Sequence, residues 1–201
     1  MIHIVKNFIN QEDLKTVQEY IKTIKFNTKD EHVPLHDNLF HKHNAPFDIH
    51  TRGEMPKEIL DVFSKYSRGY WELVSEIEDI KYHPPMFSKH YIARYNVGEL
   101  DGFHYAHLRP ENTYGSYIYW TNDFKGGELC FENDPSCISL EPGDLIFFKE
   151  SESNKHRITN LTEGVAFLSE SWMSPVGTCP DPNVEYDSVY WDDWEIKGFY
   201  E

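Results

Sequence analysis

Apolar residues recur at helical spacing near the start of the chain. Asn10 is a good N-cap residue, and acidic residues fill the turn that follows it. The apolar positions after the cap are Leu14, Val17, Ile21 and Ile24. Because they return every three or four residues, they predict a helix over residues 11–25.

A second apolar stripe follows further along the chain. Its members are Leu60, Phe63, Tyr70, Val74 and Ile77. Their spacing predicts a helix over residues 57–78. We expect a kink or an interruption at Gly69, because glycine costs a helix about 1 kcal/mol relative to alanine.

Residues 27–53, between the two stripes, show no regular apolar pattern. They contain five histidines: His32, His36, His41, His43 and His50. No tight metal-ligand spacing is completed among them, so we interpret these histidines as solvated. The segment is expected to be a long loop or a set of short pieces. The functional alternative is a lid over a site.

Beyond Pro84 and Pro85, short β-like runs follow one another with turn residues between them. We predict eight strands, at residues 87–97, 102–108, 115–121, 128–131, 137–140, 144–149, 156–159 and 164–172. Two helices followed by eight short strands predict an all-β core with flanking helices. The expected architecture is an antiparallel barrel or jelly-roll sandwich, with the helices packed outside the larger sheet.

The length of the chain, 201 residues, fits one domain. We divide it into a helical and loop support with the possible lid (1–83), a jelly-roll core (84–174) and an acidic, aromatic tail (175–201). The tail is expected to wrap the surface or to contact a partner. We find no internal repeat and no low-complexity segment.

The charge balance excludes several kinds of partner. There are 34 acidic residues against 19 Lys and Arg, a formal net charge of -15. Such a chain repels phosphate backbones and anionic lipids, so we expect no nucleic acid and no membrane as partner. No apolar run approaches the roughly 20 residues of a membrane span. The start of the chain lacks a signal-peptide layout.

The three cysteines are Cys130, Cys137 and Cys179. They are odd in number and form no CxxC pair. We interpret them as ordinary thiols in a reducing setting, which predicts a cytoplasmic protein.

The candidate chemistry rests on a series of landmark residues in the second half of the chain. In order they are Tyr95, Gly98, His104, Tyr119, Asn122, Gly126, Gly127, Glu128, Phe131, Pro142, Gly143, Asp144, Phe148, His156, Gly164 and Trp172. Their order and spacing resemble the prolyl-4-hydroxylase-like branch of the Fe(II)/2-oxoglutarate-dependent dioxygenases, over residues 87–174. Asn122 stands one place later than in the family pattern. The resemblance implies a double-stranded β-helix, the jelly roll of that superfamily.

The resemblance also implies a metal centre and a cosubstrate. It places the two metal-ligating, catalytic imidazoles at His104 and His156, with Fe(II) as the expected metal. In the family, two histidines and one carboxylate hold the ion, and a buried cation pairs with the distal carboxylate of 2-oxoglutarate. The residues expected to line the cofactor pocket are Tyr95, Tyr119, Glu170 and Trp172. Tyr117 and Trp120 are further candidates for its walls.

Two positions depart from the family pattern. Ala106 stands where the family has the metal-ligand Asp, and Ala166 stands where it has an Arg or Lys. Trp172 keeps its place six residues after Ala166, so a shift in register restores neither residue. Glu170 shares a strand face with Ala166, and its charge would repel a dianionic cosubstrate. Ordinary 2-oxoglutarate turnover is therefore expected to be weak or absent.

Three functions remain open at this point. The first is an oxidoreductase that hydroxylates a small molecule or a peptide side chain, or halogenates it at the position that Ala106 leaves open. The second is a catalytically degenerate oxygenase fold that acts as a binding module. The third is a 2-oxoglutarate-independent oxidase whose metal is held by His104, His156 and Glu170. A further imidazole at His107, or an anion-binding cation elsewhere, would alter the site; the candidate cations are Arg94, Arg109 and Lys149.

Overall fold

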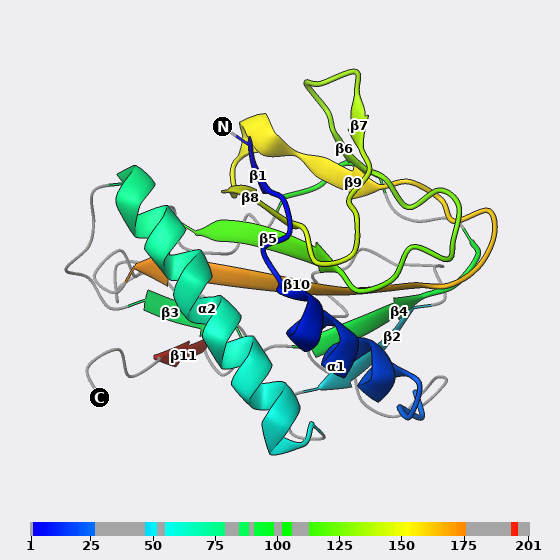
Figure 1. Ribbon diagram of the computed structural model, residues 1–201. Helices are drawn as coiled ribbons and strands as arrows, with labels where there is room; N and C mark the ends of the chain where they lie inside the picture. The colour runs from blue at the N-terminus through cyan, green and yellow to red at the C-terminus, as the bar shows by residue number, and fades with distance from the viewer. Residues whose placement is uncertain are drawn as a thin grey trace.

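The computed structural model describes residues 2–26, 47–51, 55–78, 85–88, 91–98, 102–105, 113–175 and 194–196. Two α-helices are present in this part of the chain, α1 (Gln11–Ile21) and α2 (Lys57–Glu78) (Figure 1). The strands are β1 (Ile2–Val5), β2 (Phe47–Thr51), β3 (Pro85–Ser88), β4 (Tyr91–Tyr95), β5 (Tyr114–Tyr119), β6 (Leu129–Phe131), β7 (Cys137–Ile138), β8 (Leu145–Lys149), β9 (His156–Ile158), β10 (Ala166–Pro175) and β11 (Trp194–Ile196). A short 3-10 helix spans Glu152–Asn154.

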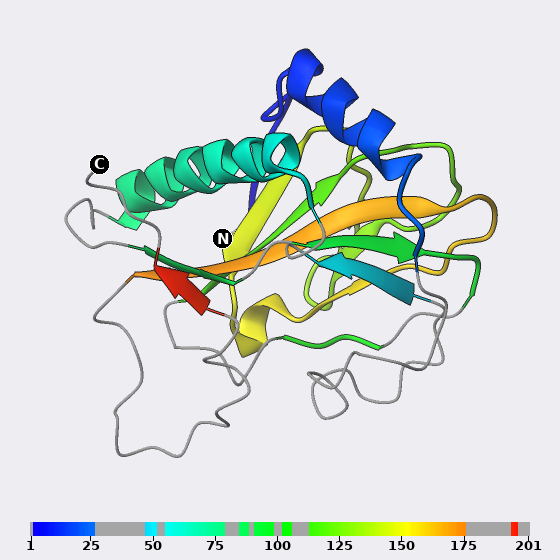
Figure 2. The same cartoon turned by 90° about the horizontal axis from the view of Figure 1, so that it is seen from below.

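The strands form two antiparallel sheets. The larger sheet has eight strands in the order β1-β8-β5-β10-β3-β11, and β4 pairs with both β10 and β2 beside this path. The smaller sheet has the order β7-β6-β9. Both helices lie over the same face of the larger sheet (Figures 1 and 2). This arrangement is a double-stranded β-helix, or jelly roll, which confirms the predicted fold class.

The first helix begins where the sequence predicts and ends earlier. The Asn10 side chain accepts a hydrogen bond from the backbone N–H of Asp13 (2.9 Å), which caps the first turn. The helix ends at Ile21, whereas the prediction extended to residue 25. The second helix runs unbroken, so the interruption predicted at Gly69 was wrong. A Cβ at Gly69 would lie 3.4 Å from the ring of Phe8, so the glycine makes room for that ring.

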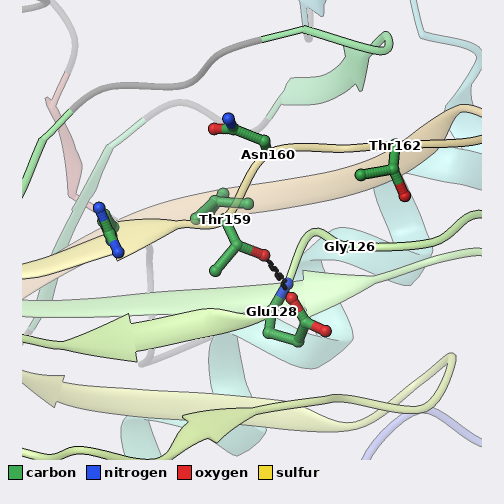
Figure 3. A pocket seen from close by; sticks show the side chains of 7 residues that line it. Gly126, Glu128, Thr159, Asn160 and Thr162 are labelled. Carbon is green, nitrogen blue, oxygen red and sulfur yellow. Dashed lines mark hydrogen bonds between the residues drawn. The ribbon is translucent and has the colours of Figure 1, made fainter.

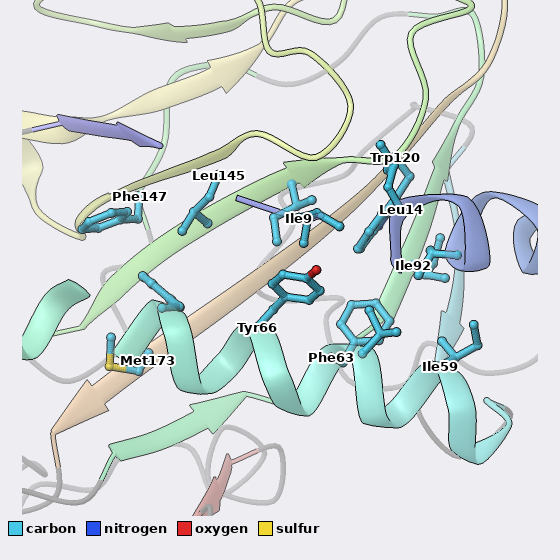
Figure 4. Close-up of a cluster of buried hydrophobic side chains, with 14 of the residues drawn as sticks. Ile9, Leu14, Ile59, Phe63, Tyr66, Ile92, Trp120, Leu145, Phe147 and Met173 are labelled. Carbon is cyan, nitrogen blue, oxygen red and sulfur yellow. The ribbon is translucent and has the colours of Figure 1, made fainter. Parts of the chain in front are cut away.

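Each face of the larger sheet buries its own apolar cluster. The outer cluster lies against the helices and joins Val17 and Phe63 to Trp120, Phe147 and Met173 of the sheet (Figure 4). The inner cluster lies between the two sheets; its members include Tyr95, Tyr117, Tyr119, Phe148, Ala166 and Leu168. Side chains alternate between the faces because the strand period is two.

Six of the eight predicted strands correspond to β5–β10. The run predicted at 87–97 is divided into β3 and β4, which pair with different parts of β10. Of the run predicted at 102–108, the described residues hold one isolated bridge and no strand. Three strands were not predicted: β1, β2 within the expected loop, and β11 within the expected tail. All three pair with strands distant in sequence, so local patterning does not reveal them.

One landmark, the Pro142-Gly143-Asp144 turn, serves the fold. Gly143 has a φ of +85°, which favours glycine, and its carbonyl accepts a hydrogen bond from the N–H of Ile9 (2.9 Å). The carboxylate of Asp144 accepts from the Lys6 ammonium (2.6 Å) and from the backbone of Asn7 (3.0 Å). These bonds lower the pKa of Asp144 despite its burial. The turn therefore fixes the start of α1 against the sheet.

Cys130 and Cys137 stand directly opposite each other on β6 and β7 and form a disulfide. The prediction of free thiols was therefore wrong for this pair. A spacing of seven residues does not by itself predict a disulfide. The register of β6 and β7 brings the two sulfurs together. Cys179 lies outside the described residues.

Other predictions also fall on residues that the structure does not describe. Most of the segment proposed as a lid belongs to this group, as do Ala106, His107 and Arg109. Among the described residues, no helix combines the length and the apolar character that crossing a membrane requires.

Candidate functional site

The two histidines singled out in the sequence lie side by side. Their ring centroids are 4.9 Å apart, with the ring planes inclined by 52°. His156 begins β9, and His104 pairs with it across an isolated antiparallel bridge. The N–H of His104 donates to the carbonyl of His156 (3.0 Å), and the N–H of His156 donates to the carbonyl of His104 (2.8 Å). The backbone thus holds the two imidazoles together.

The hydrogen bonds of the two rings define their tautomers. His104 Nδ1 lies 3.2 Å from the carbonyl of Gly102, and His156 Nδ1 lies 3.1 Å from the carbonyl of Asn154. A carbonyl only accepts, so in the neutral rings both Nδ1 atoms carry the hydrogen. The lone pairs are therefore on the two Nε2 atoms. This is the arrangement found in metal-ligating histidines, whose other ring nitrogen donates to a backbone carbonyl or carboxylate.

His156 is held neutral by its surroundings. The residue is 2% exposed and lies against Phe148, whose ring centroid is 4.6 Å away. Burial, together with the charge of His104, lowers the pKa of His156 to about 3. A neutral imidazole has no proton to lose before it binds a metal ion. The hydroxyl of Tyr117 donates to His156 Nε2 (3.0 Å) and marks the direction of the lone pair.

A buried carboxylate lies near this histidine pair. Glu170 on β10 is opposite Tyr117 on β5 and is 5% exposed. Its two oxygens each accept one hydrogen bond, from the hydroxyl of Tyr95 (2.8 Å) and from that of Tyr91 (2.8 Å). Burial raises the pKa of Glu170, while the two hydroxyls and the charge of His104 oppose the rise. We refer to His104, His156, Glu170 and Tyr91, Tyr95 and Tyr117 as the inner site.

The other predicted pocket residues have partners of their own. The hydroxyl of Tyr119 donates to the carbonyl of Gly127 (2.7 Å). The indole N–H of Trp172 donates to Glu150 (3.1 Å). Trp120 belongs to the outer cluster, where it donates to Ser169 (2.8 Å), so the interpretation of Trp120 as a pocket wall was wrong.

Tyr91 is the member of the inner site that sequence reasoning missed. It precedes Tyr95 by four residues on the same strand, so a period of two places both side chains on one face. That signal was available in the sequence. The sequence does not show that β4 pairs with β10, the strand that carries Glu170, so it could not place Tyr91 beside that carboxylate.

The histidine pair presents two imidazole nitrogens, a donor type that divalent transition metals accept. Within the described residues, no three His, Cys, Asp or Glu side chains are placed to hold one ion. Glu170 therefore does not complete a three-ligand set with His104 and His156 in this structure.

Among the described residues, the inner site offers no cation for the distal carboxylate of 2-oxoglutarate. In the described part of the chain, no Lys or Arg pairs with Glu170. Arg94, proposed as a displaced anchor, lies on the outer face of its strand, 4.9 Å from the ring centroid of Phe26. Ala166 is buried on β10, on the inner face that the sequence predicts it to share with Glu170. The inner site thus offers a carboxylate where an anionic cosubstrate requires a cation.

A separate pocket of about 410 Å³ lies beside β9 (Figure 3). Its lining residues are Gly126, Glu128, Arg157, Ile158, Thr159, Asn160 and Thr162. Glu128 and Thr159 are hydrogen-bonded to each other across it. None of these residues belongs to the inner site.

Comparison with known proteins identifies the fold. The sequence matches no family model and no curated protein. Among solved structures, it is similar to a viral collagen prolyl hydroxylase from Paramecium bursaria Chlorella virus-1 in a 2-oxoglutarate complex (TM-score 0.60, 17% identity, 86% of this chain and 94% of that one). The chain has the fold of the 2-oxoglutarate/Fe(II) oxygenases.

Two further structures support this conclusion. A prolyl hydroxylase from Trichoplax adhaerens, in complex with a hypoxia-inducible-factor peptide fragment, gives a TM-score of 0.63 at 15% identity, over 88% of this chain and 84% of that one. A Pseudomonas putida prolyl-4-hydroxylase gives 0.61 at 12% identity, over 86% and 91%. At these identities the oxygenase likeness concerns the fold alone.

Proposed function

We propose that this oxygenase fold is a non-haem, metal-dependent oxidoreductase whose ion, Fe(II) first, is held by His104 and His156. The observation that carries the proposal is the pair of adjacent imidazoles with both Nδ1–H groups bonded to backbone carbonyls. Fe(II) held by the two Nε2 atoms would supply the oxygen chemistry typical of non-haem iron sites. With Ala106 in place of the carboxylate ligand, the remaining positions would be open to water, halide or substrate.

Tyr117 has a positioning role in this proposal. Its hydroxyl occupies the Nε2 lone pair of His156, so it must turn away when that nitrogen binds a metal. Burial, together with the charge of Glu170, raises the pKa of Tyr117 well above its usual value. The phenol therefore stays neutral and remains a hydrogen-bond donor beside the ligands of the metal.

The proposed substrate is a small molecule or a peptide side chain, to be hydroxylated or halogenated. The similar Trichoplax adhaerens structure holds a peptide fragment, which supports a peptide as one of the two classes. The net charge of -15 argues against nucleic acid.

Metal content tests the proposal. The full chain is loaded anaerobically with Fe(II), freed of excess ion and measured for bound iron. We expect about one ion per chain, and a loss of at least tenfold in affinity for His104→Ala and for His156→Gln. His104 is exposed, so its truncation leaves the core intact. The matched control is His3→Ala, because His3 stacks on Phe147 of the outer cluster. Unchanged iron content in His104→Ala would refute the proposed ligands.

Binding of 2-oxoglutarate is a second test. Calorimetry on the iron-loaded protein is expected to show no micromolar binding, because a buried distal carboxylate would lack a cation beside Glu170. Ala106→Asp together with Ala166→Arg should improve binding by more than the sum of the single changes, since both support one complex. Tight binding by the unaltered chain would contradict this expectation and would make Arg109 the first anchor to test, because Lys149 shares the outer face of β8 with Phe147.

A binding module is the second candidate function. It is favoured by the lack of a third His, Cys, Asp or Glu ligand among the described residues. A chain that holds no iron after loading, yet retains its fold, would support the binding module over the oxidoreductase.

A further inference from the structure

Glu170 is a buried carboxyl group, and no Lys or Arg pairs with it in the described part of the chain. Each of its oxygens accepts one tyrosine hydroxyl, and each oxygen has the capacity for a second bond. Both donors are neutral phenols. A positive charge on His104 would favour the ionised form of this carboxyl group. The two phenols bring no positive charge, so the carboxylate of Glu170 can still pair with a cation.

Three tyrosines surround Glu170, and they are compatible with a cationic ligand. Tyr91, Tyr95 and Tyr117 lie near its carboxylate, and the charge of Glu170 raises the pKa values of Tyr95 and Tyr117 further, beyond the effect of burial. The hydroxyl ends of Tyr91 and Tyr95 point at the carboxyl group, so their oxygens can also accept a hydrogen bond from a ligand cation.

We propose that the inner site binds its ligand through a cationic nitrogen, an ammonium or guanidinium group, that pairs with Glu170 among Tyr91, Tyr95 and Tyr117. The inference deepens the proposed function by naming the charge of the ligand, and it rests on that function in placing the substrate at the same site. The cation supplies a charge that no described Lys or Arg provides, and the pair becomes a charge-assisted hydrogen bond. Ligands with a carboxylate at the same end are rejected, because like charges repel strongly at low dielectric.

A competing role for Glu170 is to balance the charge of the metal. A positive charge at His104 would lower the pKa of Glu170, and a metal ion bound to His104 would lower it as well. The two roles differ in what the loss of the carboxylate changes: binding of an amine in one case, retention of metal in the other. This difference determines the experiment.

The test compares three probes of equal length: butylammonium, 1-butanol and butyrate. Binding to the full chain is measured by ligand-detected NMR at pH 7, without metal and again after iron loading. We expect butylammonium to bind at least tenfold more tightly than the other two probes. In Glu170→Gln, which keeps the shape and removes the charge, this preference is expected to fall below threefold.

Glu150→Gln is the matched control. Glu150 is also buried, at 7% exposed, but its carboxylate accepts from the indole of Trp172, and its charge raises the pKa of Tyr117 less than that of Glu170 does. We expect this variant to keep the tenfold preference. If Glu170→Gln fails to fold, judged by circular dichroism, Tyr95→Phe replaces it. Removing this hydroxyl takes away a hydrogen bond that favours the ionised carboxylate, so the preference for butylammonium should fall at least twofold.

Three results would overturn the inference. One is the absence of binding, or equal binding, for the three probes. Another is a preference that survives in Glu170→Gln. The third is a loss of iron in Glu170→Gln with unchanged butylammonium binding, which would assign the carboxylate to the metal. Failure of the metal proposal is a separate result, since it is read from iron content in His104→Ala and does not involve the probes.

Discussion

Acidification is expected to destabilise the metal-free protein through His156. The pKa of this buried ring is about 3 in the folded chain, against 6.5 for an ordinary histidine. Between these values the unfolded chain binds one proton more than the folded chain, so the free energy of unfolding falls as the pH falls. Each pKa unit corresponds to about 1.4 kcal/mol. At pH 5 the loss from this residue alone is about 2 kcal/mol, and it approaches about 5 kcal/mol at pH 3.

The assay is urea unfolding of the wild-type chain and His156→Gln, followed by tryptophan fluorescence in the presence of a chelator. Glutamine does not titrate, and the difference between the two proteins cancels the contributions of the other groups. Above about pH 6.5 we expect a constant difference. Below it, the wild type should lose stability relative to the variant by about 1.4 kcal/mol per pH unit. Two curves that stay parallel down to pH 4.5 would refute the buried, neutral state of His156.

Two further predictions concern the fold around the inner site. Reduction of the Cys130–Cys137 disulfide should lower the free energy of unfolding by about 2.5 kcal/mol, because the disulfide closes a short loop and limits the entropy of the unfolded chain. Urea unfolding with and without dithiothreitol checks this. A variant with serine at both positions should not respond to the reductant. Gly126→Ala should cost about 2 kcal/mol or more, because φ is +79° there and a Cβ would lie 2.0 Å from the carbonyl of Asn160. Gly102→Ala is its control, since nothing lies within 4 Å of that position, and equal melting temperatures for the two variants would contradict the argument.

The arrangement of Glu170 changes how the departures at Ala106 and Ala166 are understood. By the resemblance alone, alanine at these two positions would indicate simple decay of a cosubstrate site. Here a carboxylate with two tyrosine donors occupies the inner face instead. A buried charge is costly to maintain without a use. This cost is the physical reason for testing a cationic ligand rather than a restored cosubstrate site.

Local periodicity was sufficient for much of the fold. The spacing of apolar residues located both helices, and turn residues separated six of the strands correctly. The same period placed Ala166 and Leu168 on one face of β10, and the structure buries both in the inner cluster. These features depend on neighbours within a few positions, which is why the sequence alone determined them.

Only the tertiary structure decided how distant residues meet. The strand β2 exists because it pairs with β4, and the disulfide exists because β6 and β7 adopt one register. The partners of Glu170 and the contact between His104 and His156 likewise follow from strand pairing. The resemblance to the oxygenase family singled out the two histidines. Their tautomers depend on backbone carbonyls, and the low pKa of His156 depends on burial, both of which arise only in the folded chain.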